Sequence, residues 1–210
     1  MNIVEKLISE DKYTLKCPYS MTPKYITIHN TGNKASAENE IAYMQRNDSS
    51  TSFHIAVDDK VAILGIPLNR NAWHCGDSNG KGNRESIGVE ICYSTSNAEQ
   101  FRKAELHAIE VVKWLMQNFN IPIENVVPHK KWSGKDCPHK TDMNWFISQL
   151  KTQKVGQCCQ TLNTTKDDVY TKAVNKLVEK GVISSPKVWL DDKFTTDNVH
   201  SLIIKIGNKL

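Results

Sequence analysis

Apolar residues alternate with polar ones in several short stretches of the first 130 residues, a pattern typical of β-strands. The turn Asp58-Asp59-Lys60 separates two of these stretches, which we expect to form an antiparallel hairpin. The predicted strands are residues 25–28, 52–57, 61–64 and 86–92.

A second spacing, of three and four residues, predicts one long helix at 97–119, and shorter helices are expected at 36–46 and 142–150. Ser96 or Asn97 can cap the long helix, and Ile121-Pro122 ends it. Its buried stripe is expected to contain Phe101, Ala104, Ala108, Val112, Leu115 and Phe119. Strands and helices alternate between residues 24 and 129, so the predicted fold is α/β, a mixed central sheet flanked by helices.

The apolar periodicity disappears after residue 151, where Thr, Gln, Asn and Lys dominate. We therefore predict a first domain at 1–152, a linker at 153–165 and a small, mostly helical module at 166–210. About 45 residues bury little core, so this module is expected to be marginal alone or to pair with another copy of itself.

Composition limits the classes of function. The 210 residues are 39% hydrophobic and 24% charged, as in folded proteins. The net charge of +4, without a block of Lys or Arg, argues against nucleic-acid binding, although it would favour an anionic polymer such as a bacterial wall. We expect neither a signal peptide nor a membrane anchor. Free thiols are expected at Cys17, Cys75, Cys92, Cys137, Cys158 and Cys159.

Glu90 interrupts an otherwise apolar strand, where an unpaired carboxylate is costly to bury. By alternation, Gly88, Glu90 and Cys92 share one face, which we expect to line a polar cleft. A structural salt bridge or an edge strand facing water would explain Glu90 equally well.

Three residues offer metal-ligand chemistry. His29 ends one strand, His129 ends the apolar run 126–128, and Cys137 follows eight residues later. Two neutral imidazoles and a thiolate suit a catalytic zinc that keeps one open position. From the residues alone, surface or core histidines and a buried apolar cysteine are the commoner explanation, and the metal site stays open.

Five stretches together resemble a known family. They are YITIHNT at 25–31, SFH at 52–54, NAWHCG at 71–76, NRESIGVE at 83–90 and HKKWSGKDCP at 129–138. Their order resembles the zinc-dependent N-acetylmuramoyl-L-alanine amidases of type 2, which are related to a phage lysozyme and to peptidoglycan recognition proteins. The resemblance covers residues 1 to about 150 and is strongest to endolysins of phages and prophages infecting Bacillus and Clostridium.

The resemblance implies that His29, His129 and Cys137 bind Zn²⁺. It further implies that Glu90 is the catalytic carboxylate and Lys135 its cationic partner, whose ammonium stabilises the tetrahedral oxyanion.

Three further residues are candidates for contact with the substrate or support of the site. Trp73 and His74 are expected to wall the groove for the muramyl-peptide and His54 to support the site, with simple packing roles as the alternative. Cys75 beside His74 raises the question of a second metal pair, which we do not expect.

The implied function is that of an endolysin, which hydrolyses the amide between N-acetylmuramic acid and L-alanine in peptidoglycan. One alternative is a recognition module that binds peptidoglycan without cutting it. Another, with Cys137 as nucleophile and His129 as base, is disfavoured by Pro138. The module 166–210 is expected to hold the enzyme on the wall through a secondary wall polymer. Such an enzyme would be made in the host cytoplasm and reach the wall after holin-type release.

Overall fold

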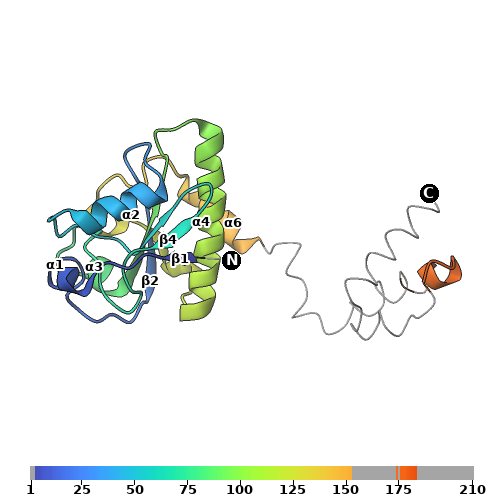
Figure 1. Cartoon of the computed structure of the whole chain (residues 1–210), viewed down its shortest axis with the longest axis horizontal. Coiled ribbons are helices and arrows are strands. Elements are labelled where there is room, and N and C mark those ends of the chain that lie inside the picture. Colours follow the sequence, from blue (N-terminus) through green and yellow to red (C-terminus); the bar gives the residue numbers. More distant parts are fainter. Residues whose placement is uncertain (1–2, 153–173, 175, 184–210) are drawn as a thin grey trace. The chain divides into compact units, whose positions relative to one another are not determined.

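The computed structural model describes residues 3–152, 174 and 176–183. The chain divides into two compact units, Met1–Thr152 and Gln153–Leu210, and each is described by itself. The first unit contains the sheet and all of the candidate site residues (Figure 1).

Within residues 3–152 the sheet has six strands in the order β1-β4-β3-β5-β2-β6. Neighbours run parallel except for β3 and β4, which are antiparallel, so the predicted mixed sheet and its hairpin are confirmed. The strands are β1 (Ile3–Glu5), β2 (Tyr25–Asn30), β3 (Ile55–Val57), β4 (Ala62–Leu64), β5 (Ser86–Ile91) and β6 (Val126–Pro128).

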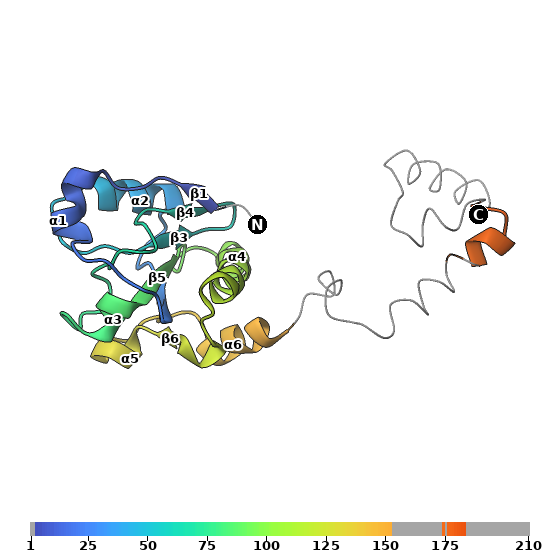
Figure 2. The ribbon, with the colours of Figure 1, turned by 90° about the horizontal axis from the view of Figure 1, so that it is seen from below.

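Helices flank this sheet, with α4 and α6 along one side and α2 and α3 along the other (Figure 2). The six α-helices of this unit are α1 (Tyr13–Lys16), α2 (Ala37–Arg46), α3 (Lys81–Glu85), α4 (Ala98–Phe119), α5 (Lys130–Ser133) and α6 (Met143–Lys151). Two short 3₁₀ turns, Glu10–Lys12 and Ile123–Asn125, complete the unit.

The three predicted helices are confirmed, and each begins at a polar cap. The side chains of Ser36, Asn97 and Asp142 accept hydrogen bonds from backbone N–H groups in the first turns of α2, α4 and α6. Asn120 ends α4 in the left-handed conformation, which asparagine tolerates well.

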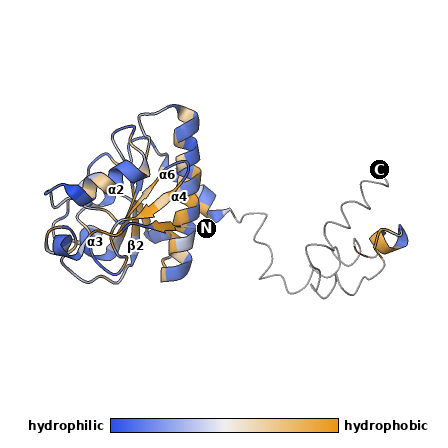
Figure 3. Ribbon diagram, viewed as in Figure 1, coloured by the Kyte–Doolittle hydropathy of each residue, from blue (hydrophilic) through white to orange (hydrophobic). Residues whose placement is uncertain are grey.

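Burial follows the predicted stripe of α4. Phe101, Ala104, Ala108, Val112 and Leu115 are buried in the main core, while Phe119 packs half-buried at its edge. Figure 3 shows that the strands are the most hydrophobic part of the unit. Because the sheet is packed in the core, it holds the polar residues at its strand ends in fixed positions.

In the second unit, Val174, Val182 and Ile183 form a small apolar cluster with Leu177 and Val178. The predicted linker 153–165 and most of the predicted module 166–210 lie outside the described residues, so the domain division stays a prediction.

Cys17, Cys75, Cys92 and Cys137 are free and buried, whereas Cys158 and Cys159 lie outside the described residues. Among the described residues, no helix combines the length and the apolar character that crossing a bilayer requires.

Candidate metal centre

Strand register brings the first two candidate residues together. β2 and β5 pair in parallel with His29 opposite Glu90, and residues paired in this way lie on the same face of a sheet. The His29 Nδ1 atom lies 3.9 Å from the Glu90 Oε1 atom. The position of His29 beside Glu90 agrees with the prediction that Glu90 faces a polar region.

The other two candidate ligands come from the next strand and its loop. His129 directly follows β6, which pairs with β2, and Cys137 lies in the loop after α5. The His29 Nδ1 atom lies 3.1 Å from the His129 Nδ1 atom and 3.7 Å from the Cys137 Sγ atom. All three residues are buried, with 2%, 4% and 5% of their surface exposed. Their ligand atoms converge closely enough to hold one metal ion.

The loop that contains Cys137 is fastened to β2 by a residue that sequence reasoning missed. The Asn30 Oδ1 atom accepts hydrogen bonds from the backbone N–H groups of Lys140 and Thr141, both at 3.0 Å. The asparagine directly after His29 was visible in the sequence, but nothing there indicated its partner 110 residues away.

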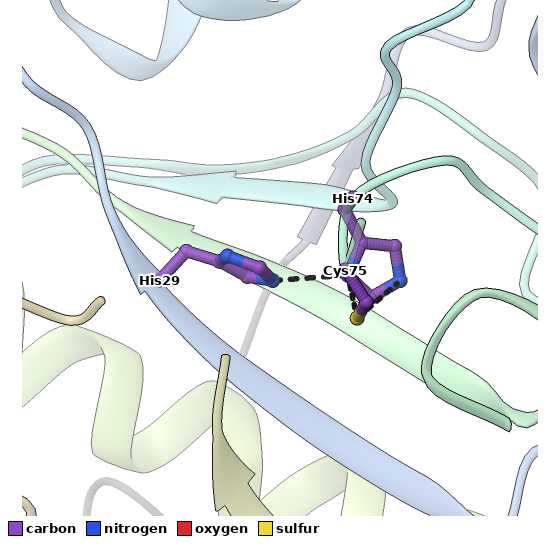
Figure 4. Close-up of side chains that lie close together, drawn as sticks. All are labelled: His29, His74 and Cys75. Carbon is purple, nitrogen blue, oxygen red and sulfur yellow. Dashed lines mark hydrogen bonds between the residues drawn. The ribbon is translucent and has the colours of Figure 1, made fainter. Parts of the chain in front are cut away.

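A second convergent set consists of His29, His74 and Cys75, all buried (Figure 4). The His74 Nδ1 atom lies 2.9 Å from the His29 Nε2 atom and 3.0 Å from the Cys75 Sγ atom. The two sets use opposite nitrogens of the His29 ring. The expectation that His74 and Cys75 form no second metal pair stays a prediction, although the structure does place both beside a candidate ligand.

Burial sets the charge state of this cluster. It lowers the pKa of His29 well below its ordinary value, and the neighbouring His74 and His129 add to the effect. Burial likewise lowers the pKa values of His74 and His129. It raises the pKa of the Cys137 thiol. The imidazoles are thus held neutral, the form that binds metals.

Glu90 has an unusual protonation equilibrium for a carboxyl group. Burial raises its pKa to about 8; the charge of Glu40 adds to the rise and the charge of Lys135 opposes it. The Lys135 side chain is exposed, and its backbone carbonyl accepts a hydrogen bond from the Cys137 N–H. A carboxyl group that titrates near neutrality is suited to taking up and releasing a proton during a reaction.

The remaining predicted residues surround the cluster. Trp73 is half-buried and packs edge to face against Tyr19, with ring centroids 6.1 Å apart. His54 is fully buried, accepts a hydrogen bond from the Gly88 N–H at 2.9 Å and lies 2.9 Å from the Arg70 carbonyl. These contacts agree with support from His54, whereas contact of Trp73 or His74 with a substrate stays a prediction.

A mixed sheet flanked by helices, with two histidines, a cysteine and a carboxylate gathered where three parallel strands end, fits a hydrolase with a metal site. Residues 19–140 match the family described as N-acetylmuramoyl-L-alanine amidase, Amidase_2, and the chain belongs to this family.

Curated relatives carry the same description. The amidase CwlA of a Bacillus species is 47% identical over 185 residues, which cover 85% of this chain and 74% of the relative. CwlA of Bacillus subtilis strain 168 is 54% identical over 155 residues, 72% of this chain and 56% of the relative. XlyB of the same strain is 49% identical over 180 residues, 85% and 57%. The chain thus spans little more than half the length of the two B. subtilis relatives.

Solved structures agree. The structure of PlyL has 57% sequence identity and a TM-score of 0.71, covering 72% of this chain and 98% of that one. The PlyG catalytic domain has 56% identity and a TM-score of 0.71, covering 77% and 100%. The predicted family, fold class and enzyme class are confirmed, and the catalytic interpretation is favoured over the non-catalytic recognition module.

Proposed function

We propose that the chain is an endolysin that hydrolyses the amide between N-acetylmuramic acid and L-alanine in peptidoglycan, with Zn²⁺ held by His29, His129 and Cys137. The observation that carries the proposal is the convergence of these three side chains beside Glu90 in a member of the amidase family. Family membership supports the bond and the substrate.

The donor set fits zinc. The His129 Nε2 atom lies 2.9 Å from the backbone carbonyl of Cys75, which can only accept, so this nitrogen carries the proton. The Nδ1 lone pair of His129 is therefore directed toward His29 and Cys137. Two imidazole nitrogens and a sulfur are ligands that zinc prefers, and three protein ligands leave a position for the reaction.

Zinc bound there would polarise the scissile carbonyl and lower the pKa of a water molecule. Glu90 would take the proton from the attacking water and pass it to the departing amine of L-alanine, which needs a carboxyl group with a pKa near the working pH. Lys135, whose charge already acts on Glu90 and His29, would stabilise the negative oxygen of the tetrahedral intermediate.

Two further parts of the proposal concern the cell. The segment 166–210 would hold the enzyme on the wall through a secondary wall polymer, and deletion from residue 152 onward should then weaken sedimentation with walls. As an endolysin, the chain would be made in the host cytoplasm and reach the wall after holin-type release. Induced expression should therefore lyse cells only when a holin is co-expressed.

The deciding experiment combines elemental analysis with product analysis. Wild-type protein is expected to contain one zinc and to release new L-alanine amino termini from walls without new reducing sugar ends. Glu90→Ala should keep its zinc and lose turnover, while Cys137→Ala should lose both. New reducing ends would identify a glycosidase instead, and full activity of zinc-free Cys137→Ala would refute the assigned metal site.

A further inference from the structure

His74 occupies an unusual place for a residue expected to wall a groove. Only 7% of its surface is exposed, and its ring contacts His29 edge to face, with ring centroids 5.0 Å apart. The His74 Nδ1 atom lies 2.9 Å from the His29 Nε2 atom. A dashed line in Figure 4 marks this contact. His74 therefore contacts the side of the His29 ring opposite to His129 and Cys137.

The partners of His74 determine which of its ring nitrogens carries the proton. Its Nε2 atom lies 3.3 Å from the Ser86 carbonyl oxygen, which can only accept a hydrogen bond. A neutral imidazole has one N–H, so the proton is on Nε2 and His74 Nδ1 is an acceptor. The Cys75 thiol, 3.0 Å from the same Nδ1 atom, is a further potential donor to it.

An acceptor at this position dictates the state of His29. The His29 Nε2 atom must donate to His74 Nδ1, so the lone pair of His29 is on Nδ1. That Nδ1 atom is the one 3.1 Å from His129 Nδ1 and 3.7 Å from Cys137 Sγ. The chain Ser86, His74, His29 therefore presents the correct nitrogen of His29 to the candidate metal position before any metal binds.

Backbone and packing hold His74 in this orientation. The Asn83 Oδ1 atom accepts hydrogen bonds from the N–H groups of His74 and Cys75, both at 2.8 Å. A methyl group at Gly88 of β5 would lie 2.8–2.9 Å from three atoms of the His74 ring. Glycine at this strand position thus leaves the space that the ring occupies.

We propose that His74 is a positioning residue, which accepts the His29 Nε2–H and thereby fixes the tautomer and orientation of His29 as a metal ligand. The proposal rests on the proposed metal site. Outer hydrogen-bond partners of this kind typically contribute about 10- to 100-fold to metal affinity.

The first test needs neither metal nor activity. Long-range ¹H–¹⁵N NMR of the metal-free full chain reports which nitrogen of each neutral histidine carries the proton. We expect His29 to be protonated at Nε2 in the wild type and in His74→Asn, whose side-chain oxygen can accept near the position of Nδ1. In His74→Leu, which lacks an acceptor, His29 should become a mixture of both tautomers. An unchanged His29 in His74→Leu would overturn the proposal.

The second test measures Zn²⁺ affinity by competition with a chromophoric chelator. His74→Leu should bind zinc about 10- to 100-fold more weakly, with His74→Asn within a few-fold of wild type. His107→Leu is the control, because His107 in α4 is partly buried and its Nδ1 atom lies 2.9 Å from a backbone carbonyl, that of Asp58, outside the candidate site. An equal loss in His107→Leu would mean that removal of any packed histidine weakens zinc binding, against the proposal.

The outcomes separate this inference from the proposed function. If Cys137→Ala binds zinc as tightly as wild type, the metal site itself is wrong. If Cys137→Ala loses zinc while His74→Leu keeps both its affinity and its His29 tautomer, only the role of His74 is wrong. Two zinc ions per wild-type chain would make His74 a ligand in a second site and would also overturn its role as acceptor. Should His74→Leu fail to fold, Gly88→Ala replaces it in the comparison with His74→Asn: the added methyl group displaces the His74 ring and should weaken zinc affinity, whereas His74→Asn keeps an acceptor and should not, and equal affinities would overturn the proposal.

Discussion

Replacement of Glu90 by glutamine should make the metal-free protein more stable at alkaline pH. Burial raises the pKa of this carboxyl group from 4.5 to about 8, so folding disfavours its ionised form. Below pH 4.5 Glu90 is protonated in both the folded and the unfolded chain. Between pH 4.5 and 8 the unfolded chain releases the proton and the folded chain retains it, so the wild type loses stability as the pH rises; above pH 8 the loss is complete.

The structure also bounds the size of this effect. Each pH unit in the interval corresponds to about 1.4 kcal/mol, so the range from 4.5 to about 8 amounts to at most about 5 kcal/mol. The 18% exposure of the Glu90 side chain admits some solvent and reduces this figure. Glutamine has nearly the same shape and no charge, so Glu90→Gln removes the pH-dependent part and leaves the packing.

The measurement is urea unfolding of chelator-treated wild type and Glu90→Gln at pH 4 to 9, followed by tryptophan fluorescence. The difference in unfolding free energy should be constant below pH 4.5, change in favour of the variant up to pH 8, and then stay level. Glu90→Ala should give the same pH-dependent part with a different constant offset. A difference that is flat from pH 4 to 9 would show that Glu90 is solvated well enough to ionise normally, and the burial argument would fail.

Other predictions test the remaining parts of the site and fold. Lys135→Met should lower kcat about 100-fold while zinc content stays unchanged, and an unaltered kcat would remove Lys135 from the reaction. Chelation should abolish wall lysis and lower the Tm of the wild type, with both restored by Zn²⁺; lysis that persists in excess chelator would argue against metal catalysis. Asn97→Ala should cost about 1 kcal/mol of unfolding free energy through loss of the α4 cap, checked by urea unfolding. Phe146→Ala should cost about 3–5 kcal/mol, because this ring is fully buried, and a loss under 1 kcal/mol would contradict its place in the core.

The regular spacing of apolar residues made the longer elements predictable from sequence. The spacing of Phe101 to Phe119 predicted α4 to within a residue, since a buried stripe on a helix of 22 residues leaves a strong periodic signal. The cap of α4 was also readable as Ser96 or Asn97, and Asn97 is the one used, because capping depends on residues adjacent in the chain.

Short elements were not predictable, because tertiary contacts form them. β1 has three residues and exists through its pairing with β4, and α3 and α5 are too short for any periodicity. The predicted strand 52–57 is regular only from Ile55, because Ser52 donates its N–H to the Trp73 carbonyl instead of a neighbouring strand. Such exchanges of partner leave no trace in local sequence.

The candidate site was likewise only partly predictable from the sequence. The residue types at positions 29, 129 and 137 left a metal site open, and only the resemblance to the amidase family selected it; strand register explains why His29 lies beside Glu90. The sequence could not show which nitrogen of His29 faces which neighbours, because His74 and His129 both lie far from it along the chain. Two His and Cys sets share that ring, and the proposed His29 tautomer, set by His74 and the Ser86 carbonyl, favours the set with His129 and Cys137. The chemistry proposed for the site therefore depends on the hydrogen-bond chain from Ser86 through His74 to His29. The only local sequence feature related to this chain is Gly88, a glycine within a strand, where a side chain would collide with the His74 ring.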